Sequence, residues 1–100
     1  MDAALPELDE FDILRRGSRW AALAPIEARI IEVLLERSGR VVRRREFSSV
    51  WPHGMPAPRA LDARLVLLRD RIAPLGLRIR TVRARGFLLD VAPIGDASPS

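Results

Sequence analysis

The chain lacks cysteine altogether and has a single histidine, His53. Without cysteine it can form no disulfide, no thiolate nucleophile and no zinc ribbon, and one histidine cannot build a multi-histidine metal site. No apolar run approaches the roughly 18 residues that a membrane span requires. The acidic start is also unlike a signal peptide. We therefore expect a cytoplasmic protein that carries no metal and no other cofactor.

Lysine is absent as well, so all 17 cationic side chains are arginines. The first twelve residues contain five acids and no base, whereas residues 13–91 contain every arginine and only seven acids, a net charge of +10. A folded segment with this charge favours an anionic partner. The chain has no glycine-rich phosphate loop, and no acid or nucleophile is spaced to serve His53. We therefore expect no enzyme.

One hundred residues suffice for a single small domain. We expect a flexible acidic arm at residues 1–8, a folded domain at residues 9–91 and a disordered tail at residues 92–100, because the tail consists of small and polar residues. Within the domain, the pattern predicts a short N-terminal hairpin whose strands run from Phe11 to Arg15 and from Arg19 to Leu23.

The first half of the domain then has the pattern of two helices. Pro25 suits a first helical position, and Gly39 lies where a helix would end in a left-handed residue. Between them runs an apolar stripe made of Ile26, Ile30, Val33 and Leu34. A second, shorter helix is expected from about Arg43 to Val50, with Phe47 and Trp51 facing inward. Three glutamates on the first helix are most simply assigned to its solvent face: Glu27, Glu32 and Glu36.

The last third of the chain predicts a helix followed by a hairpin. Four apolar side chains recur on one helical face: Leu61, Leu65, Leu68 and Ile72. Pro74 and Gly76 end this helix. Apolar and polar residues then alternate, which predicts a strand with Arg78 and Arg80 on one face. The chain turns at residues 83–86 and returns as a second strand. A helix with such a hairpin is the build of a winged helix.

These segments together resemble the OmpR/PhoB-type winged-helix effector domain of bacterial response regulators. The resemblance runs from about Leu23 to Asp90 and rests on four stretches in the same order and spacing: LAPIEARIIEVLLERSGRVVRRREF, VWP, RALDARLVLLRDRI and IRTVRARGFLL. It implies an α+β winged helix-turn-helix with a short N-terminal antiparallel sheet, three helices and a C-terminal β-hairpin wing. It also implies that the third helix enters the DNA major groove.

The resemblance sets two further expectations about the N-terminal part. Such domains usually follow a phosphorylatable receiver domain, and these 100 residues contain none, so we expect a free-standing member or a fragment of a longer regulator. The family's N-terminal sheet normally has four strands. Only about 22 residues precede the first helix here, which leaves room for two strands or three short ones.

Three consecutive arginines, Arg43, Arg44 and Arg45, crowd the expected first turn of the second helix, where the family usually has a serine-like cap. Cations at this end oppose the helix dipole by about 0.3–1 kcal/mol. An anion should offset this cost, and a DNA phosphate would do so. The simpler interpretation is that the three side chains point into water.

The outward side of the third helix is expected to meet base edges through Arg59, Ala63 and Arg64. Val66 and Leu67 also lie toward this side, where the family commonly has polar or basic residues. Three interpretations stay open for this aliphatic pair. It can rest against thymine methyl groups in the major groove, form a protein contact surface, or pack under the proline-rich loop that precedes the helix.

The hairpin supplies the remaining candidate DNA contacts, namely Arg80 on its first strand and Arg83 and Arg85 at its turn. Arginine at a wing tip suits the negative potential of a narrow minor groove. A solvated hairpin end is the alternative. Ala84 stands where the family usually has glycine, so the tip should differ slightly in shape.

We therefore predict sequence-specific binding of double-stranded DNA by a small bacterial transcriptional regulator. The third helix would lie in the major groove and the wing on the backbone or minor groove. By resemblance alone, the loop from Trp51 to Pro58 corresponds to a segment that can touch RNA polymerase, and a homodimer is a further expected assembly. The alternative is a protein-interaction module that uses the exposed aliphatic face of the third helix for dimerisation or docking.

Overall fold

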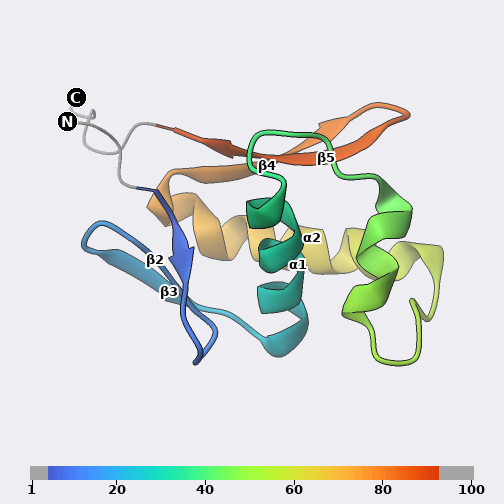
Figure 1. Cartoon of the computed structure of the whole chain (residues 1–100), viewed down its shortest axis with the longest axis horizontal. Helices are drawn as coiled ribbons and strands as arrows, with labels where there is room; N and C mark the ends of the chain where they lie inside the picture. The colour runs from blue at the N-terminus through green and yellow to red at the C-terminus, as the bar shows by residue number, and fades with distance from the viewer. Residues whose placement is uncertain (1–4, 93–100) are drawn as a thin grey trace.

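The computed structural model describes residues 5–92. A three-stranded antiparallel sheet comes first, in the order β1 (Glu7–Leu8), β2 (Ile13–Arg16) and β3 (Arg19–Ala22). The helical segments that follow are α1 (Pro25–Glu36), the 3-10 helix η1 (Arg44–Val50), α2 (Pro58–Ile72) and the 3-10 turn η2 (Ala73–Leu75). Strands β4 (Leu77–Val82) and β5 (Gly86–Val91) pair as a C-terminal hairpin. Figure 1 shows the hairpin along the top of the helices, with the N-terminal sheet at one end and η1 at the other. This is the predicted winged helix.

The core lies between α1, α2, η1 and the inner faces of both sheets. The four residues predicted to form the buried face of α2 are all fully buried: Leu61, Leu65, Leu68 and Ile72. Phe47 of η1 is buried as predicted, and its ring meets that of Phe87 edge to face at 6.0 Å between centroids. Trp51 is half-buried. The apolar periodicity therefore identified the buried faces of the helices.

The N-terminal sheet has three short strands, one of the two possibilities that the length of the segment allowed. Part of the expected arm belongs to it, because Glu7–Leu8 pairs with β2 and places Glu7 opposite Arg15. The prediction of a loose arm at residues 1–8 is therefore wrong at its end, while residues 1–4 lie outside the described residues. Asp9 closes the β1–β2 turn by accepting hydrogen bonds from the N–H groups of Phe11 and Ile13. The bond from Ile13 is the main reason that the pKa of Asp9 is lowered.

The C-terminal boundary also differs from the prediction by one residue. Ala92, the first residue of the expected tail, donates its backbone N–H to the Gly76 carbonyl at 2.9 Å. Its own carbonyl accepts a hydrogen bond from Arg16. Ala92 is therefore part of the fold, and the remainder of the expected tail, residues 93–100, lies outside the described residues.

Arg16 joins the N-terminal sheet to the end of α2 from a fully buried position. Its guanidinium donates to the carbonyls of Leu75 at 2.8 Å and Gly76 at 3.2 Å, as well as to that of Ala92. Carbonyls at the C-terminal end of a helical segment carry partial negative charge, so a cation is favoured there. Burial is the main cause that lowers the pKa of Arg16. The contact fixes the position of the sheet against the helix end.

Glu27 is not on the solvent face of α1, which corrects the prediction for that residue. Its side chain is fully buried. It occupies the third position of the helix, so its carboxylate can turn back and accept the N–H of Ala24 at 2.9 Å. The same carboxylate pairs with Arg71 of α2, whose Nε lies 3.0 Å from Oε1 and 3.2 Å from Oε2. A buried carboxylate needs such partners, and here they link α1 to α2. Glu32 and Glu36 are exposed as predicted.

The base of the wing is tied to the segment between α1 and η1. Val42 and Phe87 exchange two backbone hydrogen bonds of 2.7 and 2.9 Å. The neighbouring Gly86 has φ +149°, and a Cβ atom there would lie 2.1 Å from the Val42 carbonyl oxygen. Only glycine allows this approach of two backbones. The bridge therefore sets the distance between the start of η1 and the tip of the wing.

Candidate nucleic-acid interface

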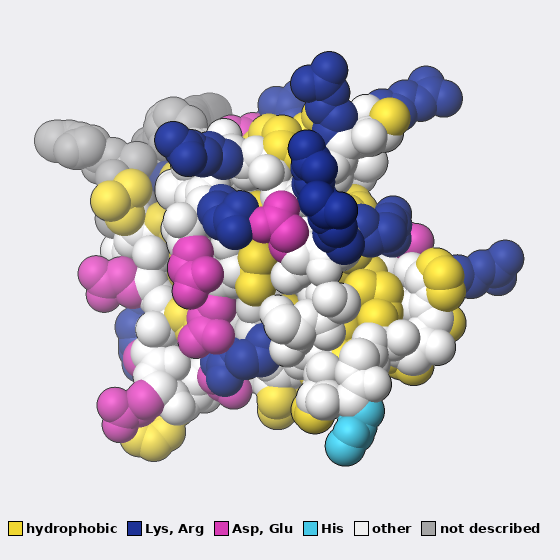
Figure 2. All heavy atoms as spheres, turned by 45° about the vertical axis from the view of Figure 1, so that its right-hand side comes forward, with side chains coloured by type: hydrophobic (Ala, Val, Ile, Leu, Met, Phe, Trp, Pro, Cys, Tyr) yellow, Lys and Arg dark blue, Asp and Glu magenta, His cyan; other side chains and the backbone are white. Residues whose placement is uncertain are grey.

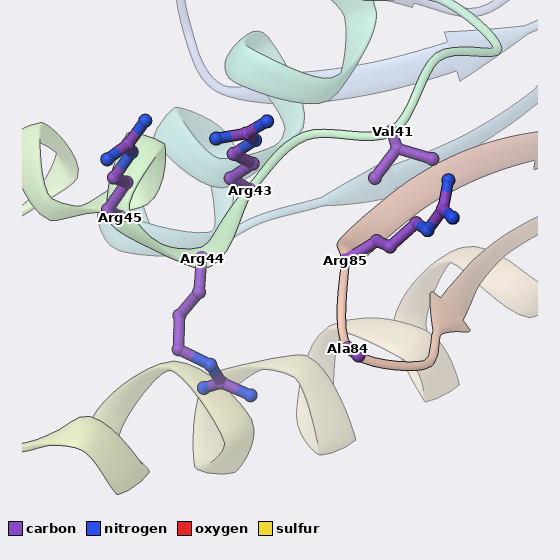
Figure 3. A pocket seen from close by; sticks show the side chains of 6 residues that line it. All are labelled: Val41, Arg43, Arg44, Arg45, Ala84 and Arg85. Carbon is purple, nitrogen blue, oxygen red and sulfur yellow. The ribbon is translucent and has the colours of Figure 1, made fainter.

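A hollow of about 630 Å³ lies between the start of η1 and the tip of the wing. Its lining residues are Val41, Arg43, Arg44, Arg45, Ala84 and Arg85. Figure 3 shows Arg43 and Arg45 directed to one side of the η1 segment, Arg44 directed toward α2, and Arg85 directed toward Val41 from the wing. The structure thus brings together arginines that are about 40 residues apart in the sequence.

Three of these arginines have no ion-pair partner in the described part of the chain, although the Glu46 carboxylate attracts Arg43 at longer range. Within residues 5–92, Arg43, Arg45 and Arg85 make no ion pair and no side-chain hydrogen bond, and the same holds for Arg83 at the wing tip. All four are exposed. Figure 2 shows arginine side chains gathered on the hairpin side of this face, whereas acidic side chains gather toward the N-terminal sheet. A cationic hollow of this kind fits a polyanion.

Arg44 behaves differently from its neighbours, because it is held within the domain. Both of its terminal nitrogens lie 3.2 Å from the Asp62 carboxylate of α2, and its guanidinium carbon lies 5.3 Å from the centre of the Phe87 ring. One side chain thereby contacts η1's two neighbours, α2 and the wing. Its charge is shared with Asp62, so its main role in the fold is to position the three elements. The 18-residue separation from Asp62 offers no local sequence signal for this contact.

The anion that offsets the cations at the start of η1 also comes from the protein itself. The Glu46 carboxylate accepts the backbone N–H of Arg43 at 3.0 Å and pairs with Arg37 at 2.7 Å. The hydrogen bond from Arg43 is the main cause that lowers the pKa of Glu46. The residue three positions after the cap is where a capping carboxylate is expected. Glu46 was therefore detectable in the sequence, and DNA is not needed to stabilise this helix end.

The two strand arginines of the wing share one carboxylate. Arg78 and Arg80 lie on the outer face of β4, as predicted, while Leu77 and Ile79 are buried on the other. Arg78 lies 3.7 Å and Arg80 3.4 Å from the Asp90 carboxylate of β5. Arg80 is therefore partly neutralised, unlike Arg83 and Arg85. The hairpin register pairs Arg78 with Asp90 directly, so counting back from the turn could have found this contact.

The turn of the wing contains an alanine in a backbone conformation that favours glycine. Ala84 has φ +63° in the turn closed by the hydrogen bond from the Arg85 N–H to the Val82 carbonyl at 2.9 Å. The left-handed conformation costs an L-residue about 1–2 kcal/mol, and glycine favours it at this position of a type II turn. The alanine that stands in place of the family's usual glycine therefore puts strain on the backbone of the wing tip.

Replacing Ala84 with glycine is expected to stabilise the domain. The relief of strain exceeds the entropy that glycine adds to the unfolded chain, which leaves a gain of about 0.5–1 kcal/mol. Urea denaturation measures this change. The matched control is Ala63→Gly on the exposed side of α2, which should lose about 1 kcal/mol because its conformation is helical. A loss of stability in both variants would refute the strain at Ala84.

The outward side of α2 is exposed along its length. Val66 and Leu67 keep 60% and 49% of their surface accessible. The interpretation that this pair packs under the proline-rich loop is therefore wrong, because both side chains are exposed. Arg59 and Ala63 are exposed on the same side, and Arg64 is half-buried beside the core stripe. Two exposed acids, Asp62 and Asp70, complete this side.

The arrangement defines the class of the protein. A three-stranded sheet supports three helical segments, and a hairpin brings unpaired arginines beside the start of η1. This is a winged-helix DNA-binding domain. None of the helices in the described part of the chain is long and apolar enough to cross a bilayer.

The comparisons with known proteins place this class in one family. The family described as "Transcriptional regulatory protein, C terminal" matches residues 18–89. The chain therefore belongs to this family, the OmpR/PhoB-type winged-helix DNA-binding domains of transcriptional regulators, which are not enzymes. No curated protein gave a significant match.

Solved structures share the fold over most of both chains. The C-terminal domain of the nisin resistance regulator NsrR, a lantibiotic response regulator, is 28% identical with a TM-score of 0.74, over 84% of this chain and 89% of that one. The AdeR DNA-binding domain in complex with an intercistronic region is 21% identical with a TM-score of 0.73, over 85% and 93%. The Klebsiella pneumoniae RstA DNA-binding domain in complex with the RstA box is 19% identical with a TM-score of 0.69, over 88% and 93%.

Proposed function

We propose that this domain binds double-stranded DNA sequence-specifically in the bacterial cytoplasm, with α2 in the major groove and the wing on the backbone or minor groove. The observation that carries the proposal is the arginine-lined hollow between η1 and the wing. Its three arginines without an ion-pair partner come from two separate elements and line the same hollow (Figure 3). Backbone phosphates are the groups of DNA that match such a surface.

The proposed DNA contact of each arginine depends on whether a carboxylate of the protein already pairs with it. Arg43, Arg45, Arg83 and Arg85 neutralise phosphates, because none of the four forms an ion pair within residues 5–92. Arg44 and Arg80 remain on the surface, but each shares its charge with an aspartate. At the start of α2, Arg59, Ala63 and Arg64 are placed to meet base edges. Arginine is the commonest partner of guanine there.

Structures that share the fold support DNA as the ligand. Two of the structures that share the fold, the AdeR and RstA domains, were solved in complex with an intercistronic region and with the RstA box. We also propose that the loop from Trp51 to Pro58 is the segment that meets RNA polymerase, and that the domain can bind DNA as a homodimer. Resemblance to the family is the support for the contact with RNA polymerase.

Selection from a pool of random duplexes tests sequence-specific binding. The chain is expected to enrich a common sequence and to bind it at least about a thousandfold more tightly than a scrambled duplex of the same composition. An Arg59→Ala variant should relax the preference at one base pair and leave the rest of the selected sequence unchanged. A pool that binds without enrichment would contradict specificity, and a pool that does not bind would contradict the proposal as a whole.

The exposure of Val66 and Leu67 favours one alternative function, a protein-interaction module. The Val66→Asp, Leu67→Asp double variant separates the two. Sedimentation and DNA titration are compared in parallel with the unsubstituted chain. If the variant no longer self-associates or captures a partner but binds the selected duplex with unchanged affinity, the protein-interaction function is favoured. If the variant is a folded monomer that has lost its affinity for the duplex, the DNA-binding function is favoured.

A further inference from the structure

The outward side of α2 is chemically unusual for a helix that faces DNA. Between Asp62 and Asp70 its exposed side chains are Ala63, Val66 and Leu67. None of these three can donate or accept a hydrogen bond. The two aspartates can only accept, and Asp62 is already engaged by Arg44. The exposed side chains in the middle of this side therefore have no donor for the acceptor atoms of a purine.

We propose that Val66 and Leu67 read the C5-methyl groups of thymine in the major groove, an inference that rests on the proposed function. The thymine methyl is the one apolar group that an unmodified base pair presents there. Neither side chain can donate a hydrogen bond to the acceptor atoms of guanine or adenine. Ala63 is small, so the helix can approach the base edges closely at its neighbour Val66.

The charges around the aliphatic pair determine which occupant fits it. Arg59 precedes the pair on α2, and the unpaired arginines of η1 and the wing lie on elements that Arg44 joins to α2. A duplex held by these arginines would lie next to α2, and DNA is therefore the ligand that best suits the pair. A second protein would need roughly 800 Å² of contact on each side. Three apolar side chains bounded by aspartates offer far less.

The aspartates also indicate that this side of α2 meets base edges. Asp70 forms no ion pair within residues 5–92 and would repel phosphates, so this part of α2 is unsuited to lie against the DNA backbone. An aspartate can, however, accept a hydrogen bond from the amino group of cytosine in the major groove. The side as a whole therefore fits base edges that present methyl or amino groups, and the aliphatic pair selects the methyl groups.

The experiment replaces each thymine of the selected duplex in turn with deoxyuridine, which removes the methyl and keeps the base pair. Fluorescence anisotropy measures the affinity of the full chain for each duplex. We expect one or two positions at which deoxyuridine binds roughly fourfold more weakly, the effect of leaving one methyl group unburied. In the Val66→Ala, Leu67→Ala variant this ratio should fall toward one at the same positions.

Arg83→Ala is the matched control, because it removes a wing contact and leaves α2 intact. It should weaken binding of the thymine and deoxyuridine duplexes equally and preserve their ratio. Thermal unfolding checks that each variant is folded, and both substituted side chains of α2 are exposed.

Two results would overturn the inference while the proposed function stands. One is tight binding to a selected sequence in which no deoxyuridine substitution matters. The other is a thymine preference that the alanine variant retains in full. If the chain binds no duplex at all, the proposed function and the inference fail together.

Discussion

The Arg43→Ala, Arg85→Ala double variant is expected to bind DNA at least about a hundredfold more weakly than the unsubstituted chain. The two side chains line the hollow from opposite sides and have no ion-pair partner within residues 5–92. A hydrogen bond to a charged group contributes about 1.5–3 kcal/mol, so two lost phosphate contacts account for this decrease. Fluorescence anisotropy with the selected duplex at physiological salt measures it.

The matched control removes two positive charges from a different part of the molecule. Arg15 and Arg19 are exposed on the N-terminal sheet, so an Arg15→Ala, Arg19→Ala variant has the same net charge as the test variant. Its affinity should change by less than about tenfold, the part due to long-range attraction. Equal losses in the two variants would show that net charge, and not the hollow, determines affinity.

The Gly86→Ala variant is expected to lose at least about 3 kcal/mol of stability. The added Cβ would lie 2.1 Å from the Val42 carbonyl oxygen and 2.8 Å from its carbon. Both atoms belong to backbone that the two hydrogen bonds with Phe87 hold in place. The chain must therefore separate the wing from the η1 segment or unfold, and a loss of this size is a large part of the 5–15 kcal/mol that a small domain typically has. Urea denaturation measures the loss.

Gly54→Ala separates this backbone contact from the cost of the glycine conformation. Gly54 has φ +83°, and an added Cβ would meet nothing within 4 Å. Alanine there should cost only about 1–2 kcal/mol, the conformational penalty itself. If Gly86→Ala were no more destabilising than Gly54→Ala, the Val42–Phe87 bridge would not have the structural role assigned to it.

Most of the fold follows from patterns that lie within single elements. The apolar spacing from Leu61 to Ile72 identified the buried face of α2, and the alternation from Leu77 to Arg80 identified both faces of β4. These patterns work because burial has the period of the secondary structure. Sequence reasoning failed at Glu27, where its position in the first turn of α1 gave it a capping role and Arg71 supplied a distant partner.

For the candidate site, the sequence could predict which residues take part but not which partners they have. The sequence placed arginines at the start of the second helix and at the wing tip, but it could not show which of them the protein itself neutralises. Arg44 meets Asp62 across 18 residues, and the hollow depends on the bridge between Val42 and Phe87. Such contacts are set by how elements pack, and no local pattern encodes them. The exposure of Val66 and Leu67 likewise required the structure, because apolar residues are not always buried.

The most direct test of the arginine surface is the salt dependence of DNA binding. Each phosphate contact adds about −0.9 to the slope of log affinity against log salt concentration. With phosphate contacts from Arg43, Arg45, Arg83 and Arg85, the slope for the selected duplex should be about −3.6, and the Arg43→Ala, Arg85→Ala variant should flatten it by about two. A slope near zero for the unsubstituted chain, or one that the double substitution leaves unchanged, would contradict the assignment of these arginines to DNA phosphates.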